Sequence, residues 1–334
     1  MPFPCIDIHS HFFPKNAPDF AKKFGEQSGP WVQLQDHGDG TGVMMLGDKP
    51  FRPVHSALWD AQVRIKELDA NHVETQIICA TPVMFAYDAP AEQTAYVASA
   101  YNDAALVMCA DSGGRLRALA QVPLQDTTHA CKELTRAMRA GCVGVQIGNH
   151  VGPREMDDEA IVAFLRHCAD ENAAVLVHPW DMLGGERLKR WMSAWTVAMS
   201  AETQFGIMAM ILGGAFDRLP AELRICFAHG GGGFPYLLGR LENAWHRRDT
   251  VRGESQYPPS HYLNRFSVDS AVFDPRALRL LIDTMGADRI MVGSDAPFPL
   301  GEEHIGDLVR AQPDVNDAAR QRMLRDNAQA FFCL

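Results

Sequence analysis

Hydrophobic positions along the chain follow two alternating patterns. Short apolar runs rich in valine and isoleucine are each followed by a longer amphipathic segment, which is typical of strand–helix units on a parallel sheet. Eight runs have this character: residues 5–9, 75–81, 117–123, 144–148, 174–179, 224–230, 266–270 and 289–295. The segment after the third run begins on Asp126, a good N-cap residue, and ends on Gly141. Eight such repeats predict an α/β fold, a (β/α)8 TIM barrel.

Two stretches depart from a plain barrel. Residues 12–54 are too long for an ordinary strand–helix loop, and residues 31–47 within them indicate two short strands around a Gly-Asp-Gly turn. We therefore expect a small β insertion over the top of the barrel. Residues 180–222 contain a long apolar helix and are expected to form a lid or an oligomer contact. Because no linker-like tract divides the chain, we predict a single domain over residues 1–334, with 12–54 as an inserted β subdomain.

Composition narrows the class of protein. The chain is 47% hydrophobic and 22% charged, as in globular proteins. Its formal net charge of −10 argues against nucleic acid and anionic membrane surfaces as partners. The apolar run 205–216 is shorter than the roughly 20 residues that cross a bilayer. The eight cysteines form no C-x-x-C pair, and no secretory signal pattern opens the chain. We expect a cytoplasmic, enzyme-sized protein.

Candidate metal ligands stand at the ends of the predicted strands. His9 and His11 end the first run, His178 the fifth, His229 the sixth and Asp295 the eighth. The carboxyl ends of barrel strands converge on one mouth, and alternate residues of a strand point the same way. Imidazoles and a carboxylate gathered at one point, with room for water, suit a single divalent ion such as zinc.

Each of these features also has a structural explanation when taken alone. A histidine pair can simply end a strand, His178 can be a hydrogen-bonded loop residue, and Asp295 can cap a helix. The glycine run at 230–233 is similar to an esterase oxyanion loop or a phosphate cradle. Because neither a G-x-S-x-G elbow nor a P-loop accompanies it, we expect close backbone packing at the barrel mouth instead. A metal-binding module without catalysis also fits these residues.

The whole constellation resembles the amidohydrolase superfamily. Barrels of that superfamily carry H-x-H on the first strand, histidines on the fifth and sixth, and an aspartate on the eighth. Its binuclear members also use a carboxylated lysine on the fourth strand to bridge two metals. Residues 143–150 of this chain contain no lysine, so the resemblance implies a mononuclear site.

Longer stretches, spread from end to end of the chain, resemble the 2-amino-3-carboxymuconate-6-semialdehyde decarboxylases. They include DIHSHFFP, CATPVMF, LVHPWDM, VDSAVF and GSD-PFPLGE. This family comprises metal-dependent decarboxylases that use no organic cofactor and act on a ring-cleavage product of 3-hydroxyanthranilate. The resemblance implies a carboxy-lyase that releases CO2 from an anionic, unsaturated substrate. A mononuclear hydrolase or hydratase acting on a carboxylated ring-cleavage product is the alternative.

The same resemblance implies a role for each strand-end residue. His9, His11, His178 and Asp295 would bind one divalent metal per chain, most simply zinc. His229 would lie beside the metal-bound water and carry the proton, so that His229 and Asp295 are the catalytic pair.

Substrate contacts are expected from a second group of residues. The resemblance implies that Arg52 and Arg240 grip substrate carboxylates, the latter from the neighbouring subunit of a homodimer. Without it, a surface ion pair explains Arg52 equally well and is the favoured explanation for Arg240. Trp180, Met182 and Trp191 are expected to line the pocket, with core packing as the alternative.

One position departs from the family pattern. Ala296 stands where the family has a tyrosine directly after the aspartate. The change could enlarge the pocket or alter a contact behind the metal ligand, so the substrate is less secure than the reaction class.

Overall fold

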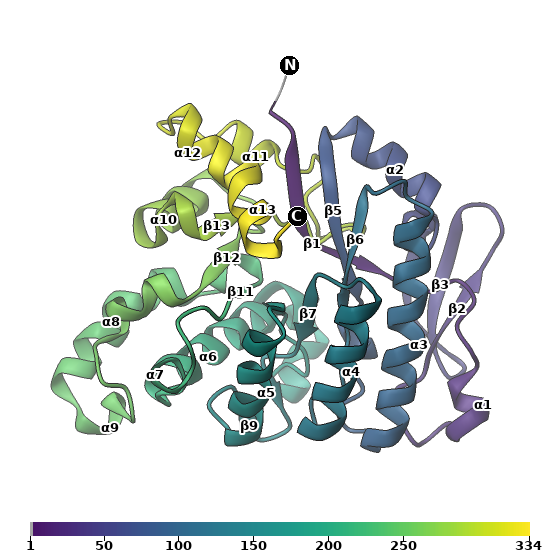
Figure 1. The fold of residues 1–334 in the computed structure, drawn as a ribbon, viewed down its shortest axis with the longest axis horizontal. Coiled ribbons are helices and arrows are strands. Elements are labelled where there is room, and N and C mark those ends of the chain that lie inside the picture. The colour runs from purple at the N-terminus through teal and green to yellow at the C-terminus, as the bar shows by residue number, and fades with distance from the viewer. Residues whose placement is uncertain (1–2) are drawn as a thin grey trace.

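The computed structural model of the protein describes residues 3–334 and contains a central barrel of parallel strands (Figure 1). Eight strands pair in the order β1-β5-β6-β7-β10-β11-β12-β13. They are β1 (Cys5–Phe12), β5 (Val73–Ala80), β6 (Leu116–Ala120), β7 (Gly144–Ile147), β10 (Ala174–Val177), β11 (Ile225–Phe227), β12 (Ser267–Asp269) and β13 (Ile290–Met291). The barrel closes where Ile8 N donates to Val292 O at 2.8 Å and Asp295 N donates to His9 O at 2.9 Å. The predicted (β/α)8 barrel is confirmed.

Helices surround these strands on the outside (Figure 1). The longer ones are α2 (Ala61–Ala70), α3 (Ala91–Ala110), α4 (Thr127–Ala140), α5 (Glu159–Asp170), α6 (Met199–Leu212), α8 (Phe234–Arg247) and α10 (Pro275–Met285). The shorter ones are α1 (Phe20–Phe24), α7 (Ala215–Arg218), α9 (Asp249–Arg252), α11 (Asp307–Arg310), α12 (Asp317–Gln321) and α13 (Asn327–Phe332). The predicted caps of α4 are present: the Asp126 side chain accepts from His129 N, and Gly141 ends the helix in the left-handed conformation. Among residues 3–334, no helix has both the length and the hydropathy needed to cross a membrane.

Two apolar layers hold the barrel together. Alternate strand residues point to opposite faces, so one set fills the inside and the other packs against the helices. The inner cluster includes Ile8, Ile77, Leu176 and Met291 from four strands, and α13 adds Phe331. These strands fix the positions of the residues that follow them at the barrel mouth.

The insertion between β1 and α2 forms a separate antiparallel sheet of β2 (Val32–Asp36), β3 (Thr41–Leu46) and β4 (Lys49–His55). The expected two strands are present, but β4 was not expected. Pro50 and Pro53 lie within it, and proline is confined to edge strands because it cannot donate to the ladder. The sheet order places β4 at an edge, which reconciles the two prolines with a strand. A two-residue hairpin, β8 (His150–Val151) and β9 (Arg154–Glu155), follows β7.

Candidate metal centre and active site

The ends of β1, β10, β11 and β13 bring their polar residues to one point. His9, His178, His229 and Asp295 each offer a ligand atom, and these atoms all lie within 4.8 Å of one another. His11 borders the same group, because its ring centroid is 5.1 Å from that of His178. Its Nε2 lies 3.0 Å from Asp295 Oδ1. The structure therefore gathers all five residues that the sequence placed at strand ends.

Buried nitrogen atoms in this cluster lack protein partners. His9 Nε2 and His229 Nδ1 have no hydrogen-bond partner among residues 3–334. Buried polar atoms normally have a partner, so the cluster fits a cation that these lone pairs could bind. The other nitrogen of His9, Nδ1, lies 2.7 Å from Asp269 Oδ2. With the proton on Nδ1, the Nε2 lone pair of His9 faces the cluster, as in metal sites where a carboxylate orients a histidine ligand.

The charge state of the cluster also suits a divalent ion. Burial lowers the pKa of His11 to about 4, and it lowers the pKa of His178 and of His229 as well. Burial alone would raise the pKa of Asp295, but the hydrogen bond with His11 and the charges of nearby imidazoles hold it far below its usual range. Burial alone would lower the pKa of His9, but the hydrogen bond and the charge of Asp269 raise it, so His9 would give up a proton when an ion binds. Neutral imidazoles and an ionised carboxylate are the forms that bind metal.

Backbone conformation separates two of these residues from their neighbours. His229 has φ 55° and Asp295 has φ 60°, in the left-handed region that residues other than glycine rarely adopt. Such conformations cost free energy and cluster at functional sites, where the surrounding structure maintains them. Nine other non-glycine residues within 3–334 share this conformation, so it supports a function for His229 and Asp295 together with their place in the cluster.

Asp269, on β12, belongs to the site but was missed in the sequence. Its Oδ1 accepts hydrogen bonds from Gly230 N at 2.8 Å and Ala271 N at 3.1 Å, while Oδ2 pairs with His9. These bonds hold the pKa of the Asp269 carboxyl below its usual value, although burial opposes them. The available signal was position: Asp269 lies near the end of the seventh predicted strand, as the other candidates lie near the ends of theirs.

The glycine run after His229 packs as expected. A Cβ on Gly230 would lie 2.3 Å from a Val272 methyl, and one on Gly232 would lie 2.0 Å from the carbonyl oxygen of Ser200. Both glycines also have positive φ. Close backbone packing at the barrel mouth is thus confirmed.

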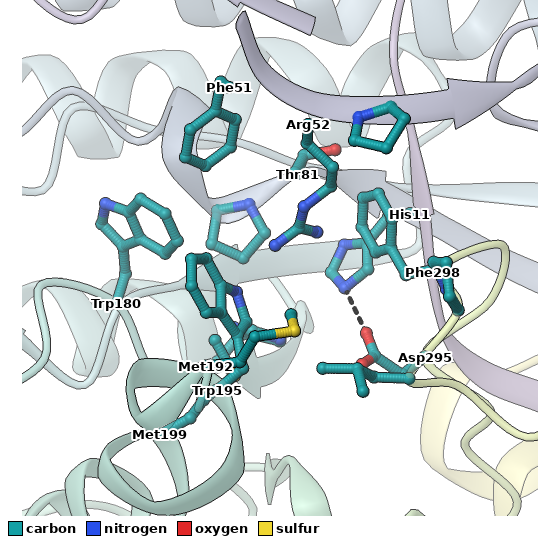
Figure 2. Close-up of a pocket in the computed structure, with 15 residues that line it drawn as sticks. His11, Phe51, Arg52, Thr81, Trp180, Met192, Trp195, Met199, Asp295 and Phe298 are labelled. Atoms are coloured by element: carbon teal, nitrogen blue, oxygen red, sulfur yellow. Dashed lines mark hydrogen bonds and ion pairs between the residues drawn. The ribbon is translucent and has the colours of Figure 1, made fainter. Parts of the chain in front are cut away.

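A cavity of about 240 Å³ opens on His11, His178 and Asp295 (Figure 2). Its walls are mainly aromatic and thioether side chains: Phe51, Trp180, Met192, Trp195, Met199 and Phe298. A second hollow of about 430 Å³ adjoins it on the side of His229, and Trp195, Met199 and Asp295 line both. An apolar pocket beside a few convergent polar groups is the usual form of a small-molecule site.

Arg52, on β4, lines the cavity and is the one lysine or arginine among residues 3–334 that does so (Figure 2). Its guanidinium carbon lies 4.3 Å from the ring centroid of Phe298 and 5.4 Å from that of Trp195. No carboxylate within residues 3–334 forms an ion pair with it. Burial lowers the pKa of Arg52, yet a guanidinium remains charged at neutral pH. The cavity thus offers an anion one free, planar fork.

The other expected substrate contacts are only partly at the cavity. Trp180 lines it, whereas Met182 and Trp191 are not among the lining residues. Trp191 is 76% exposed. The backbone has positive φ at Trp191 and Met192. Met192 and Trp195 line the cavity in place of the expected Met182 and Trp191.

Arg240 and Ala296 also lie away from the cavity of their own chain. Arg240 is exposed on α8, so a contact with substrate would require a second chain. Ala296 lines a different hollow and is not among the residues that line the cavity. Its carbonyl oxygen instead accepts a hydrogen bond from His11 N at 2.7 Å.

Comparison with known proteins places this barrel in a family. The family described as Amidohydrolase matches residues 6–334. A 2-amino-3-carboxymuconate-6-semialdehyde decarboxylase of Dictyostelium discoideum is 37% identical over 98% of this chain and 91% of the relative. One of Caenorhabditis elegans is 31% identical over 97% of this chain and 92% of the relative. The chain belongs to the amidohydrolase family and, within it, to the carboxy-lyases of the 2-amino-3-carboxymuconate-6-semialdehyde decarboxylase type.

A solved structure shares the fold across nearly the whole chain. The dihydroxybenzoic acid decarboxylase of Polaromonas, with bound manganese and the inhibitor 2-nitroresorcinol, has a TM-score of 0.79 and 23% identity. The match covers 99% of this chain and 97% of that one. At 23% identity the similarity supports a shared barrel fold only.

Proposed function

We propose that the protein decarboxylates an unsaturated carboxylate similar to 2-amino-3-carboxymuconate-6-semialdehyde. The reaction would release CO2 and give aminomuconate semialdehyde, within tryptophan and 3-hydroxyanthranilate breakdown or nitroaromatic degradation. One observation carries the proposal: a single apolar cavity joins the buried histidine–aspartate cluster to the unpaired guanidinium of Arg52. An acidic protein repels a dianion in general, so a local cation is needed to hold one. The names of the relatives supply the substrate class.

We infer one divalent ion per chain, most simply zinc, and no organic cofactor. His9, His11, His178 and Asp295 would hold the ion, and the unpartnered Nε2 of His9 supports this placement. A bound divalent ion supplies a Lewis acid that polarises a substrate oxygen or activates water near neutral pH.

The side chains of the cavity account for the remaining steps. Arg52 binds and orients a substrate carboxylate, and the aromatic walls exclude water. Loss of CO2 leaves an electron pair on carbon, which the substrate itself must hold until a proton arrives. His229 takes a proton from water at Nδ1 and delivers it to that carbon; Nδ1 is buried, unpartnered and kept neutral because burial lowers the pKa of the ring.

We further propose that the chain forms a homodimer in which Arg240 completes the neighbouring site. Its exposure on α8, away from the cavity of its own chain, supports a role between subunits. Mixing inactive Arg52→Ala and Arg240→Ala chains should then restore some activity in hybrid sites. Demonstrated heterodimers that recover no activity would contradict a site shared between subunits.

All eight cysteines are free thiols, which supports a reducing compartment such as the cytoplasm.

The proposed reaction is tested by CO2 release from a panel of substrates. The protein is stripped with a chelator and reloaded with Zn²⁺ or Mn²⁺. It is then assayed with 2-amino-3-carboxymuconate-6-semialdehyde, 2,6-dihydroxybenzoate and 5-carboxyvanillate. We expect CO2 release with the muconate semialdehyde, lost after chelation and regained with metal. Substrate consumption without CO2 would instead indicate a hydrolase or hydratase.

A further inference from the structure

A buried arginine lies directly behind the strand that carries the H-x-H pair. Arg64, on α2, is only 2% exposed. Its Nη1 donates to Gln76 Oε1 at 2.8 Å and to Ser10 Oγ at 3.2 Å. Its Nη2 donates to the carbonyl oxygen of His11, and its Nε donates to that of Ala57 at 2.9 Å. One guanidinium thus connects α2, β5 and the ligand-bearing end of β1.

The network continues through Gln76 to a buried carboxylate. Gln76 Nε2 donates to Asp7 Oδ2 at 2.7 Å, and Asp7 is 0% exposed. Asp7 also accepts from the hydroxyl of Ser294 at 2.6 Å, from the amide N–H of Ser294 at 3.0 Å and from that of His9 at 3.2 Å. Asp7 therefore holds the backbone of one proposed ligand, His9, and the residue that precedes another, Asp295.

These bonds occur where the regular strand ladder fails. The pairing of β1 with β5 shifts register between Asp7 and Ser10, the interval that contains His9. On the other side of β1, strand β13 ends at Met291, before the loop that carries Asp295. Backbone hydrogen bonds still join the two segments, from Asp295 N to His9 O and from His11 N to Ala296 O, but they lie beyond the end of β13. The side chains of Arg64, Gln76 and Asp7 supply bonds in this irregular region.

The burial of two charges here also requires an explanation. Arg64 and Asp7 form no direct ion pair, and the amide of Gln76 bridges them. Buried charges are costly, and apolar residues often stabilise a core equally well. A guanidinium, however, offers a rigid fork of donors that can reach several oxygen atoms at once. Burying these charged groups is understandable if they serve to position the backbone near the metal centre and not only to stabilise the fold.

We propose that Arg64, acting through Gln76 and Asp7, is a positioning residue that fixes the H-x-H segment against the Asp295 loop and thereby sets the metal affinity of the site. The proposal rests on the metal centre of the proposed function. It concerns ion binding and geometry, so it can be tested without turnover.

The test compares Arg64→Lys with the unsubstituted protein. Lysine keeps the charge but loses the fork. We expect the dissociation constant for Zn²⁺, measured by chelator competition, to rise about 10- to 100-fold, as for other partners outside a ligand set. The visible absorption bands of the Co²⁺-loaded protein should also change, because they report ligand geometry, which a general loss of stability does not alter. Circular dichroism of the metal-free protein establishes that the variant is folded.

Arg320→Lys is the matched control. Arg320 also donates to several backbone carbonyl oxygens, those of Val309, Arg310, Gln312 and Val315, but none of these lies at a strand end of the centre. We expect its thermal midpoint to fall while Zn²⁺ affinity and the Co²⁺ spectrum stay unchanged.

A folded Arg64→Lys protein with unchanged Zn²⁺ affinity and Co²⁺ spectrum would overturn the proposal. If that variant does not fold, Ser294→Ala decides in the same way. It removes the hydroxyl bond to Asp7 at 2.6 Å and should weaken Zn²⁺ binding several-fold. Unsubstituted protein that binds no ion would refute both the metal centre and its positioning. Intact ion binding without CO2 release would refute only the proposed reaction.

Discussion

The metal centre and the wall of the adjoining cavity share one barrel mouth but are built differently. The residues of the centre lie at or shortly after the ends of barrel strands: His9 and His11 lie in β1, His178 follows β10, and Asp295 lies in the loop after β13. The wall comes from segments added to the barrel, namely β4, residues 192–199 and residues 298–300. His9, His11 and His178 are buried and His229 and Asp295 are partly buried, whereas the segment from Leu183 to Val197 is largely exposed.

This difference separates what is fixed from what can vary. Strand ends are held by backbone hydrogen bonds to their neighbours and by buried side-chain networks, so a cluster placed there is rigid. Added segments are held by fewer buried contacts and can change without disturbing the barrel. We infer that the cluster sets the reaction class, whereas β4 and residues 192–199 set the substrate.

The largest effect is expected from removing the carboxylate of the centre. Asp295→Asn keeps the size of the side chain but loses its charge, so neutral imidazoles alone would face a divalent ion. We expect metal content far below one per chain and a loss of turnover greater than the roughly 100-fold cost of losing a partner outside the ligand set. Elemental analysis and CO2 release measure the two effects. Full metal content in the folded variant would contradict the assigned ligand set.

His229→Ala tests the division of labour inside the centre. We expect the metal to remain and turnover to fall about 10²- to 10⁴-fold, the range for loss of a general acid–base group. His229 also belongs to the group of atoms within 4.8 Å of one another, so metal content is the informative measurement. Loss of the ion together with turnover would make His229 a ligand rather than the proton carrier.

The sequence predicted the centre much better than the wall. H-x-H and the strand-end positions follow from strand periodicity and barrel geometry, which local patterns encode. Asp269 was missed because one aspartate in a strand-like run gives no local sign of a histidine partner 260 positions away. Arg64 was missed for the same reason, since its partners come from other elements. The exchange of Met182 and Trp191 for other residues depends on a backbone turn that hydrophobic spacing does not reveal.

The fold shows the same limit. All eight barrel strands could be predicted from apolar runs because burial on both faces gives a continuous apolar signal. The edge strand β4 could not, because its prolines argue against a strand and only the position of β3 shows which edge is free. The local hydrophobic pattern therefore predicts the buried barrel strands well and the edge strand of the inserted sheet poorly. Arg52, on that edge, was found through family resemblance rather than through its strand.

An intermediate effect is expected from the cation of the wall. Arg52→Lys keeps a positive charge but loses the planar fork and its stacking on Phe298. Hydrogen bonds to charged groups contribute about 1.5–3 kcal/mol, so kcat/KM should fall about 10- to 100-fold, mainly through KM. Metal content should not change, because Arg52 is not among the atoms of the cluster.

Arg190→Lys is the control for Arg52→Lys. The Arg190 guanidinium lies 4.1 Å from the ring centroid of Trp191, a similar stacking contact on an exposed tryptophan outside the cavity. We expect its kcat/KM to stay within about twofold, as for most exposed substitutions. Equal losses of kcat/KM in Arg52→Lys and Arg190→Lys would mean that residues outside the cavity of one chain also affect substrate binding.

The smallest expected effect distinguishes Trp195, which lines the cavity, from Trp191, which does not. Trp195 lines the cavity, and its indole Nε1 is buried without a hydrogen-bond partner among residues 3–334. An unpaired donor there is expected to meet a substrate oxygen, because buried donors are costly when unsatisfied. Trp195→Phe keeps an aromatic wall but loses the donor, and one neutral hydrogen bond contributes about 0.5–1.5 kcal/mol. KM should therefore rise about 2- to 10-fold with kcat little changed, while Trp191→Phe leaves both constants unaltered. A larger effect at Trp191 than at Trp195 would reverse the assignment of the wall and favour a role for Trp191 between subunits.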